Sequence, residues 1–231
     1  MRIIITGASR GIGYDTALAL AENHRVLALS RNEQRLRALE QTASQQHGND
    51  HLAYLSFDLA APNWSSLDRA VEILGGVDVL INNAGLLVNK PFETLDHSDW
   101  EQLFTVNFFG PVYLIRHLRP RLEHSDNAHV LNVSSMGGFQ GSAKFPGLSG
   151  YSASKAALSN LTECLAEEWK EKGISVNCLA LGAVQTEMLE NAFPGLEAPL
   201  RAEEMAEFMS WFALNGQRFF NGKVLPVSVS T

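Results

Sequence analysis

Short apolar runs alternate with longer amphipathic segments along the whole chain, which leaves few folds open to it. Seven runs have the length of β-strands: residues 2–6, 25–30, 51–58, 77–82, 129–134, 174–180 and 223–227. The segments between them have helical spacing, at residues 11–22, 33–46, 63–74, 99–123, 152–172 and 203–214. Nearly continuous apolar strands are typical of a sheet that is buried on both faces. The alternation therefore predicts an α/β fold, a doubly wound parallel seven-stranded sheet with helices on both faces, in a single domain over residues 1–231.

Composition excludes several other classes of protein. With 45% hydrophobic and 19% charged residues, the chain does not have the composition of a disordered protein. The net charge of −7 and the absence of a basic run lead us to expect no nucleic-acid partner and no membrane partner. Only a short apolar run precedes Thr6 and Gly7, whereas a secretory signal needs ~7–15 apolar residues. Two cysteines, Cys164 and Cys178, are too few for a disulfide framework, so we expect a cytoplasmic protein with both as small core residues.

A glycine-rich turn follows the first expected strand. Gly7, Gly11 and Gly13 lie between that strand and the start of a helix. Glycine allows a tight turn and a close approach of the backbone to a ligand, and a helix N-terminus offers unpaired N–H groups. This context predicts a site for the pyrophosphate of a nucleotide cofactor, with an ordinary tight loop as the alternative.

The end of the second expected strand bears on the choice of cofactor. An acidic residue at this position usually holds the ribose hydroxyls of NAD, but the chain has Ser30 and Arg31 there. Arg31 suits the 2′-phosphate of NADP, and Arg10 in the glycine turn could reach the same phosphate. The sequence therefore favours NADP (NADPH) over NAD, with an Arg31 that only caps a surface helix as the alternative.

Tyr151 and Lys155 lie four residues apart on an expected helix and so share a face. A charge ~4 Å from a phenolate near the protein surface stabilises it by roughly 4 kcal/mol, or about three pK units. That effect would bring Tyr151 into the range of general acid–base catalysis. Taken alone, the same spacing is more typical of an exposed helix pair.

Further motifs place these features in one order along essentially the whole chain. They are T-G-x-x-x-G-x-G at residues 6–13, N-N-A-G at residues 82–85, Asn107 in the next helix, Ser135 at the end of the fifth strand, and Tyr151 with Lys155. In this order they resemble the short-chain dehydrogenase/reductase family. The resemblance implies a Rossmann fold and an NAD(P)-dependent oxidoreductase that acts on CH–OH groups.

The resemblance also implies a role for each catalytic residue. Tyr151 would donate a proton to the substrate carbonyl, and Lys155 would lower the pKa of Tyr151 and bind the nicotinamide ribose. Ser135 would hydrogen-bond the substrate oxygen. Ser134 competes for that role, because adjacent strand residues point to opposite faces. Asn107 would hold a water that connects Lys155 to solvent.

A larger set would surround the cofactor, again as the resemblance implies. Its members are Gly7, Ser9, Arg10, Gly11, Ile12 and Gly13 around the pyrophosphate and adenosine, Arg31 at the 2′-phosphate, Asp58 and Leu59 at the adenine, Asn83, Ala84 and Gly85 at the ribose, Val184 and Thr186 at the carboxamide, and Tyr151 with Lys155. The implied activity is the reversible reduction of a ketone or aldehyde, a small-molecule carbonyl substrate, by NADPH. Two alternatives stay open: an NAD-dependent alcohol or hydroxysteroid dehydrogenase, and a non-catalytic dinucleotide-binding regulator on the same fold.

The chain departs from the family pattern at three places near the expected site. Leu181-Gly182 replaces the usual Pro-Gly, so the carboxamide loop is expected to be less fixed. The segment between Ser135 and Tyr151 is longer than usual and is expected to shape the substrate pocket. The usual C-terminal Asp-Gly-Gly is missing, so we expect the tail to contribute little to closing the site.

Two further expectations concern metals and assembly. The seven histidines show no metal-ligand spacing, so no metal is expected. The helix expected at residues 99–123 has an unusually broad apolar and aromatic face, and family members commonly pair through this helix and the Tyr/Lys helix at residues 152–172. A homotetramer or homodimer built on these two helices is therefore expected.

Overall fold

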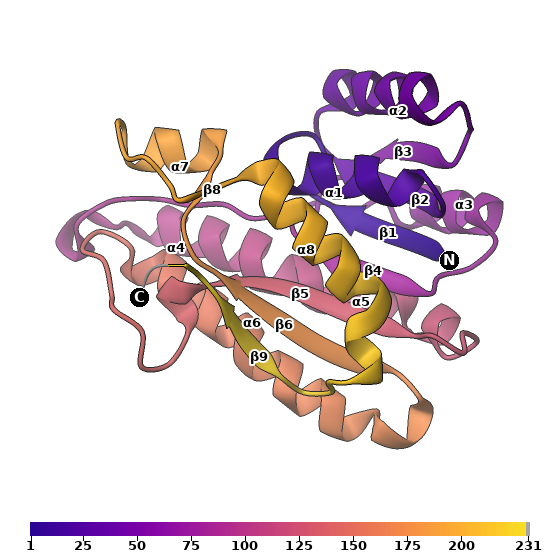
Figure 1. The fold of residues 1–231 in the computed structure, drawn as a ribbon. Helices are drawn as coiled ribbons and strands as arrows, with labels where there is room; N and C mark the ends of the chain where they lie inside the picture. The colour runs from indigo at the N-terminus through magenta and orange to yellow at the C-terminus, as the bar shows by residue number, and fades with distance from the viewer. Residues whose placement is uncertain (230–231) are drawn as a thin grey trace.

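Residues 1–229 are described by a computed structural model, in which a parallel sheet of seven strands lies between two layers of helices (Figure 1). The strand order is β3-β2-β1-β4-β5-β6-β9, and every neighbouring pair is parallel. The doubly wound α/β fold expected from the sequence is thereby confirmed. The strands are β1 (Arg2–Thr6), β2 (Arg25–Ser30), β3 (Leu52–Ser56), β4 (Val79–Asn82), β5 (His129–Ser135), β6 (Ser175–Leu181) and β9 (Val224–Val227).

Each face of the sheet is covered by three long helices. Ile3 and Ile5 point to one face and Ile4 to the other, which explains why β1 is apolar at consecutive positions. All three side chains are fully buried. The helices on the first face are α1 (Gly11–Ala21), α2 (Glu33–His47) and α8 (Ala202–Asn215), and those on the second are α3 (Trp64–Leu74), α5 (Gly110–Leu122) and α6 (Ser149–Glu168).

Helix boundaries follow local signals in the sequence. The Asn32 side chain accepts a hydrogen bond from the Arg35 N–H at the start of α2, and Gly48 ends that helix at φ 65°. Asn63 and Gly75 do the same for α3. Asparagine caps satisfy unpaired N–H groups, and glycine adopts the left-handed conformation without a Cβ penalty. These boundaries agree with the expected ones to within a residue.

The single helix expected at residues 99–123 is wrong, because it is interrupted. It consists of α4 (His97–Phe104), a π-helical turn, η2 (Thr105–Phe109), and α5. Pro111 lies at the start of α5 and has no N–H, so it cannot donate to the carbonyl of Asn107 as an α-helix requires. The Gly110 N–H bonds instead to the Thr105 carbonyl, with π spacing.

Several short elements were not predicted. They are too short to show hydrophobic periodicity: β7 (Val184–Gln185), β8 (Leu200–Arg201), α7 (Glu187–Ala192), and the 3₁₀ turns η1 (Phe92–Thr94), η3 (Met136–Gly138), η4 (Lys170–Lys172) and η5 (Gly216–Arg218). Cys178 is buried as expected, but Cys164 is exposed on α6, so its assignment to the core is wrong. Over residues 1–229, no helix is both long enough and apolar enough to cross a bilayer.

Candidate active site

A cavity of about 1330 Å³ opens at the carboxyl ends of the strands. The sheet order runs outward in opposite directions from β1 and β4, so this edge contains the topological switch point where α/β proteins bind ligands. Every site residue expected from the sequence lines the cavity, with the exception of Asn107. These lining residues are Gly7, Ser9, Arg10, Gly11, Ile12, Gly13, Arg31, Asp58, Leu59, Asn83, Ala84, Gly85, Ser135, Tyr151, Lys155, Val184 and Thr186.

The glycine turn packs too closely against its neighbours to hold side chains. Gly7 has φ 72°, and a Cβ there would lie 2.7 Å from the Ala84 Cα. A Cβ at Gly13 would lie 2.5 Å from the Gly7 carbonyl oxygen. Both contacts are shorter than atoms tolerate, so glycine is required at these positions for steric reasons.

The first turn of α1 fits an anionic group. Its N-cap residue, Arg10, makes no side-chain capping bond, and no acidic residue lies in the first turn. The unpaired N–H groups and the positive end of the helix dipole therefore have no protein carboxylate to neutralise them there. Together with the bare backbone of the glycine turn, this arrangement suits a dinucleotide pyrophosphate.

The N-N-A-G turn after β4 is fastened to the end of β1. The Thr6 hydroxyl accepts hydrogen bonds from the N–H groups of Asn83, at 3.1 Å, and Ala84, at 3.0 Å. The Asn83 amide in turn donates to the Thr6 carbonyl at 3.0 Å. These bonds hold the two loops that would enclose the cofactor in one fixed geometry.

Basic residues gather near the end of β2, the end of the cavity where adenosine is expected. Arg31 is exposed and lines the cavity just beyond β2, while the Ser30 hydroxyl donates to Ser9 at 2.8 Å. Arg10 forms an ion pair with Glu187, the first residue of α7. Arg35 on α2 binds the second oxygen of the same carboxylate at 3.0 Å.

Arg35 and Glu187 were not predicted as site residues. Arg35 lies in the first turn of the helix expected at residues 33–46, which begins shortly after Arg31, and this nearness in sequence was a usable signal. Glu187 follows Thr186 with no comparable pattern. Its two arginine partners, Arg35 foremost, lower the pKa of its carboxyl group.

Ser135 is oriented toward the cavity and Ser134 toward the core. The Ser134 hydroxyl donates to the Lys155 carbonyl at 2.9 Å and accepts from Ser159, which leaves it buried under α6. Ser135 lines the cavity together with Tyr151, and its hydroxyl accepts from the Gly137 N–H at 3.1 Å; its interaction with the Tyr151 hydroxyl lowers the pKa of Tyr151. Of the two serines, Ser135 therefore has the geometry to bind a substrate oxygen.

The pKa of Tyr151 differs from the sequence expectation. Burial raises the pKa of its hydroxyl above the usual value, and the hydrogen bond with Ser135 only partly offsets this. The expected lowering of the pKa by Lys155 is not what the structure shows. The Lys155 ammonium instead donates to the Val133 carbonyl at 2.8 Å, and its own burial lowers the pKa of Lys155 to about 8.

Asn107 does not line the cavity, but its side chain holds the backbone of Leu86, which does. Its side-chain oxygen accepts from the Leu86 N–H at 2.8 Å, and its amide donates to the Leu86 carbonyl at 2.8 Å and to Ser154 at 2.9 Å. Both its amide N–H groups are therefore engaged by protein atoms. The bound water assigned to Asn107 stays a prediction.

The loop after β5 is fastened by its own lysine. The Lys144 ammonium donates to the carbonyls of Gly137, at 2.9 Å, and Phe139, at 2.6 Å, and to the Ser142 hydroxyl at 2.8 Å. A flexible segment with many glycines is thereby held as a wall of the cavity, to which Ser142 and Phe145 contribute.

The carboxamide loop and the tail differ from what the departures in sequence implied. Leu181 is buried at the end of β6, and the Gly182 N–H donates to the Val227 carbonyl of β9 at 2.8 Å, so pairing with β9 fixes the start of the loop without proline. Ser228 lines the cavity, and a Cβ at Gly182 would contact its hydroxyl. The expectation that the tail contributes little is therefore wrong as far as residue 229; Ser230 and Thr231 lie outside the described residues.

Over residues 1–229, no three or more His, Cys, Asp or Glu side chains form a group that could hold a metal.

Comparison with known proteins supports this arrangement. Residues 1–197 match the family model for short chain dehydrogenases. Gluconate 5-dehydrogenase from Gluconobacter oxydans is 30% identical over 246 residues, covering 98% of this chain and 92% of that protein. An uncharacterized oxidoreductase of Listeria monocytogenes, Lmo0432, is 33% identical over 191 residues, covering 81% of this chain and 76% of that protein. A short chain dehydrogenase from Shigella flexneri 2a, solved in complex with NADP, has a TM-score of 0.87 at 28% identity, covering 97% of this chain and 96% of that one. With the glycine turn, the N-N-A-G turn and Ser135, Tyr151 and Lys155 gathered at one cavity, the chain belongs to the short-chain dehydrogenase/reductase family of oxidoreductases.

Proposed function

We propose that this protein is an NADPH-dependent reductase that converts a ketone or aldehyde to an alcohol and runs in reverse as an alcohol dehydrogenase. The observation that carries the proposal is the meeting of Ser135, Tyr151 and Lys155 with the glycine turn in one cavity. A protein that only binds a dinucleotide needs the turn but no positioned proton donor, so this meeting argues against the regulator alternative.

The proposed proton donor is Tyr151. Because burial raises the pKa of its hydroxyl, the phenol stays protonated near neutral pH, as reduction of a carbonyl requires. NADPH, when bound, supplies the hydride. Ser135, which lines the cavity with Tyr151, adds a second donor to the substrate oxygen and stabilises the charge that develops there.

Lys155 would position the nicotinamide ribose and supply protons to Tyr151. The Lys155 ammonium donates a hydrogen bond to the Val133 carbonyl. It also lies close to Gly85: a Cβ at Gly85 would be 3.4 Å from the ammonium nitrogen and 3.5 Å from the Asn107 side-chain oxygen. A lysine with a pKa of about 8 exchanges protons readily near neutral pH. Lys155 would bind the nicotinamide ribose and renew the proton of Tyr151 by way of a water near Asn107.

The proposed preference for NADP rests on charge. Arg10, Arg31 and Arg35 lie at the adenosine end, and no acidic residue ends β2. Two parallel N–H bonds from a guanidinium suit a phosphate. The Shigella relative, which was solved with NADP, has the same fold and supports this choice.

The protein is further proposed to be a homodimer or homotetramer. Phe109 and Tyr113, stacked at 6.1 Å between ring centroids, are 42% and 41% exposed on the η2–α5 face. Stacked aromatic side chains with exposed fractions this large are typical of a surface that a second subunit covers.

The direct test is to follow the absorbance of NADPH while diketones, aldehydes and β-ketoacyl thioesters are offered in turn. We expect oxidation of NADPH with some of these carbonyls, and loss of that oxidation in Tyr151→Phe. If NADPH binds but no carbonyl in the panel is reduced by the wild-type protein, the regulator alternative is favoured and the proposed activity is wrong.

A further inference from the structure

Large apolar side chains are left in water around the mouth of the cavity. Phe145 is 56% exposed and Leu196 is 45% exposed, and both line the cavity. They come from two separate segments, the loop after β5 and the segment after α7. Exposure of large apolar groups beside one cavity is costly unless a ligand covers them.

Buried or partly buried apolar side chains also line the cavity. They include Leu86, Leu148, Met188 and Phe193. Ser135 and Tyr151 are the hydrogen-bonding side chains assigned to the reacting carbonyl. Of the other polar lining residues, Gln102 donates to Ser98 at 2.9 Å and Ser142 donates to the Phe139 carbonyl at 2.8 Å. A polyhydroxylated substrate that contacted these apolar side chains would lose bound water without gaining hydrogen bonds from them.

Charged residues are confined almost entirely to the other end of the cavity. Among the described lining residues, Arg10, Arg31, Asp58 and Glu187 belong to the adenosine end, and Lys155 belongs to the catalytic group. The remaining charged lining residue is Glu101, whose carboxylate pairs with the exposed His97 at 3.3 Å.

Lys144 does not add a free positive charge to the substrate end, although it lies in the loop after β5 that forms part of the cavity wall. Its ammonium is engaged by two carbonyls and a hydroxyl of that loop, Gly137, Phe139 and Ser142. Among the described lining residues, the substrate end therefore offers no cation to a carboxylate or phosphate apart from Lys155, which the proposed function assigns to the nicotinamide ribose, and Glu101 would repel such a group.

We propose that the substrate is an uncharged ketone with an extended apolar body, held with its carbonyl at Tyr151 and its body against Phe145 and Leu196. The proposal rests on the reductase function above and narrows its substrate class. It excludes sugar acids, phosphorylated carbonyls and other anionic ketones from this site.

The first test compares two ketones that differ only in charge, methyl 7-oxooctanoate and 7-oxooctanoate. Their dissociation constants are measured by calorimetry with NADP⁺ present, and kcat/KM is measured with NADPH. We expect the ester to bind at least ~10-fold more tightly, because the carboxylate is desolvated without a cation. Equal or tighter binding of the carboxylate, or failure of both to bind, would overturn the proposal.

The second test extends the apolar body one methylene at a time from 2-butanone to 2-octanone. A methylene that becomes buried is worth ~0.8 kcal/mol, so kcat/KM should rise about fourfold per added carbon, mainly through a lower KM. A flat series would mean that the apolar wall does not contact the substrate, and the proposal would fall.

A variant ties this effect to the mouth of the cavity. Phe145→Ser should raise the dissociation constant and KM for 2-octanone several-fold, while those for 2-butanone and NADPH stay unchanged. Ile73→Ser is the matched control, because Ile73 is 75% exposed on α3 and does not line the cavity. Equal effects of the two variants would contradict the proposal.

The two readouts separate this proposal from the function on which it rests. If the ester binds more tightly than the carboxylate but is never reduced, the substrate class stands and the reductase activity fails. If both are reduced equally well, the activity stands and the substrate class fails.

Discussion

Glu187 and Arg10 form an ion pair that ties the first turn of α7 to the glycine turn. The second oxygen of the same carboxylate binds Arg35 at 3.0 Å. Because α7 also contributes Met188 and Leu189 to the wall of the cavity, a single carboxylate connects the glycine turn and α2 with a helix that lines the cavity. A 2′-phosphate at Arg31 would meet two neighbouring arginines that Glu187 already partly neutralises.

Glu187→Gln should therefore strengthen the binding of NADPH. Freed from the carboxylate, Arg10 and Arg35 would attract the 2′-phosphate more strongly, and we expect a dissociation constant lower by about two- to fivefold, a small effect because these groups are exposed. Binding of NADH should change little. Fluorescence titration with each cofactor measures both constants.

Glu190→Gln is the control for this substitution, because Glu190 lies on the same helix and its side chain accepts a bond from the Gly195 N–H. It should leave both constants unchanged. An equal effect of Glu187→Gln on NADH and NADPH would show that the carboxylate does not act through the 2′-phosphate.

The cofactor preference itself should depend on the end of β2. Charge-assisted hydrogen bonds contribute ~1.5–3 kcal/mol each, so wild-type kcat/KM should favour NADPH over NADH at least ~10-fold. The double substitution Ser30→Asp and Arg31→Ser should reverse the preference, since it removes an attraction and adds a repulsion. The preference should also weaken as salt is added. Values that favour NADH in the wild type would disprove this reading of Arg31.

Tyr151→Phe tests the proton donor. Loss of a positioned general acid typically costs ~100-fold or more, so kcat should fall at least that far while the NADPH dissociation constant is nearly kept. Turnover close to the wild-type value would refute the assigned role.

The same tyrosine makes a prediction about pH. Oxidation of the alcohol needs the phenolate, and burial raises the pKa of Tyr151, so the wild-type oxidation rate should climb through the alkaline range. Reduction needs the phenol and should persist to higher pH than a free tyrosine would allow. Paired pH profiles of the two directions measure this, and a reduction rate that collapses near neutral pH would be inconsistent with it.

The proposed subunit interface can be broken at one residue. Tyr113→Glu places a charge on the exposed aromatic face of α5, where a subunit contact would have to desolvate it, so we expect monomers in place of dimers or tetramers. Light scattering at micromolar concentration reads the mass directly. Ile73→Glu, on the exposed side of α3, is the control and should leave the assembly intact. A wild-type protein that already has the monomer mass of 25.3 kDa would contradict the proposal.

The parts of the fold that the sequence predicted well are those fixed by short-range rules. Buried strands such as β1 show their apolar runs, and α2 shows its cap at Asn32 and its terminating Gly48, because these signals act over a few residues. The break in the helix at η2 could also have been read from Pro111, whose missing N–H makes a regular helix impossible there.

Contacts between residues far apart in sequence could not be predicted in the same way. The bond between Arg35 and Glu187 joins residues 152 positions apart, and no periodicity marks an exposed ion pair. The bond from Lys155 to Val133 could not be predicted for the same reason: helical spacing showed that Lys155 and Tyr151 share a face, but not that a strand carbonyl accepts a hydrogen bond from the ammonium.

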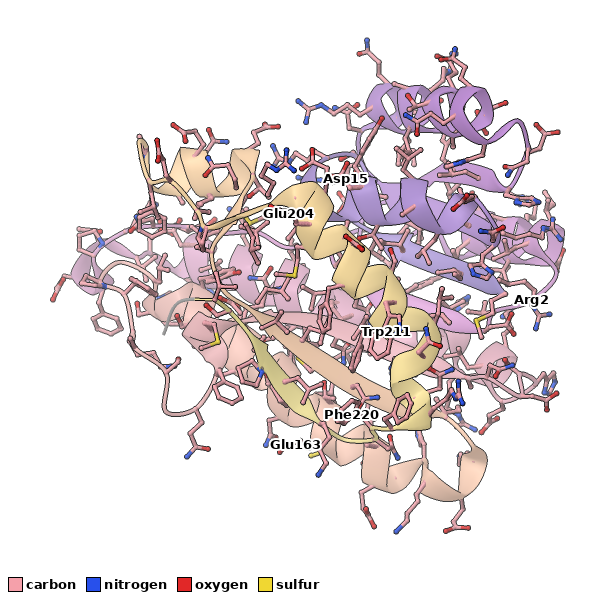
Figure 2. All side chains as sticks on the ribbon, in the orientation of Figure 1. Arg2, Asp15, Glu163, Glu204, Trp211 and Phe220 are labelled. Carbon is pink, nitrogen blue, oxygen red and sulfur yellow. The ribbon has the colours of Figure 1, made fainter. Side chains whose placement is uncertain are left out.

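A last prediction concerns Asp15, whose carboxyl group is half-buried where α1 packs against α8. Figure 2 shows it beside the first turn of α8, where Glu204 lies. Burial, and then the negative charge of Glu203, raise the pKa of Asp15 to about 6. The folded state therefore binds more protons than the unfolded state between about pH 4 and pH 6, and this group makes the free energy of unfolding fall as pH rises through that window. Above about pH 6, the full free-energy cost of holding Asp15 as a half-buried carboxylate lowers the stability of the folded state.

Asp15→Asn should remove that penalty. At pH 7 the variant should be more stable than the wild type by about 1–2 kcal/mol, less than the full pKa shift implies because water still reaches the carboxylate. At pH 4 the wild-type group is protonated, so the difference should nearly vanish. Urea denaturation at both pH values gives the two free energies of unfolding, with the exposed Asp126→Asn as a control that should change neither. A gain of equal size at pH 4 and pH 7 would show that packing of the amide, and not the buried charge, is responsible.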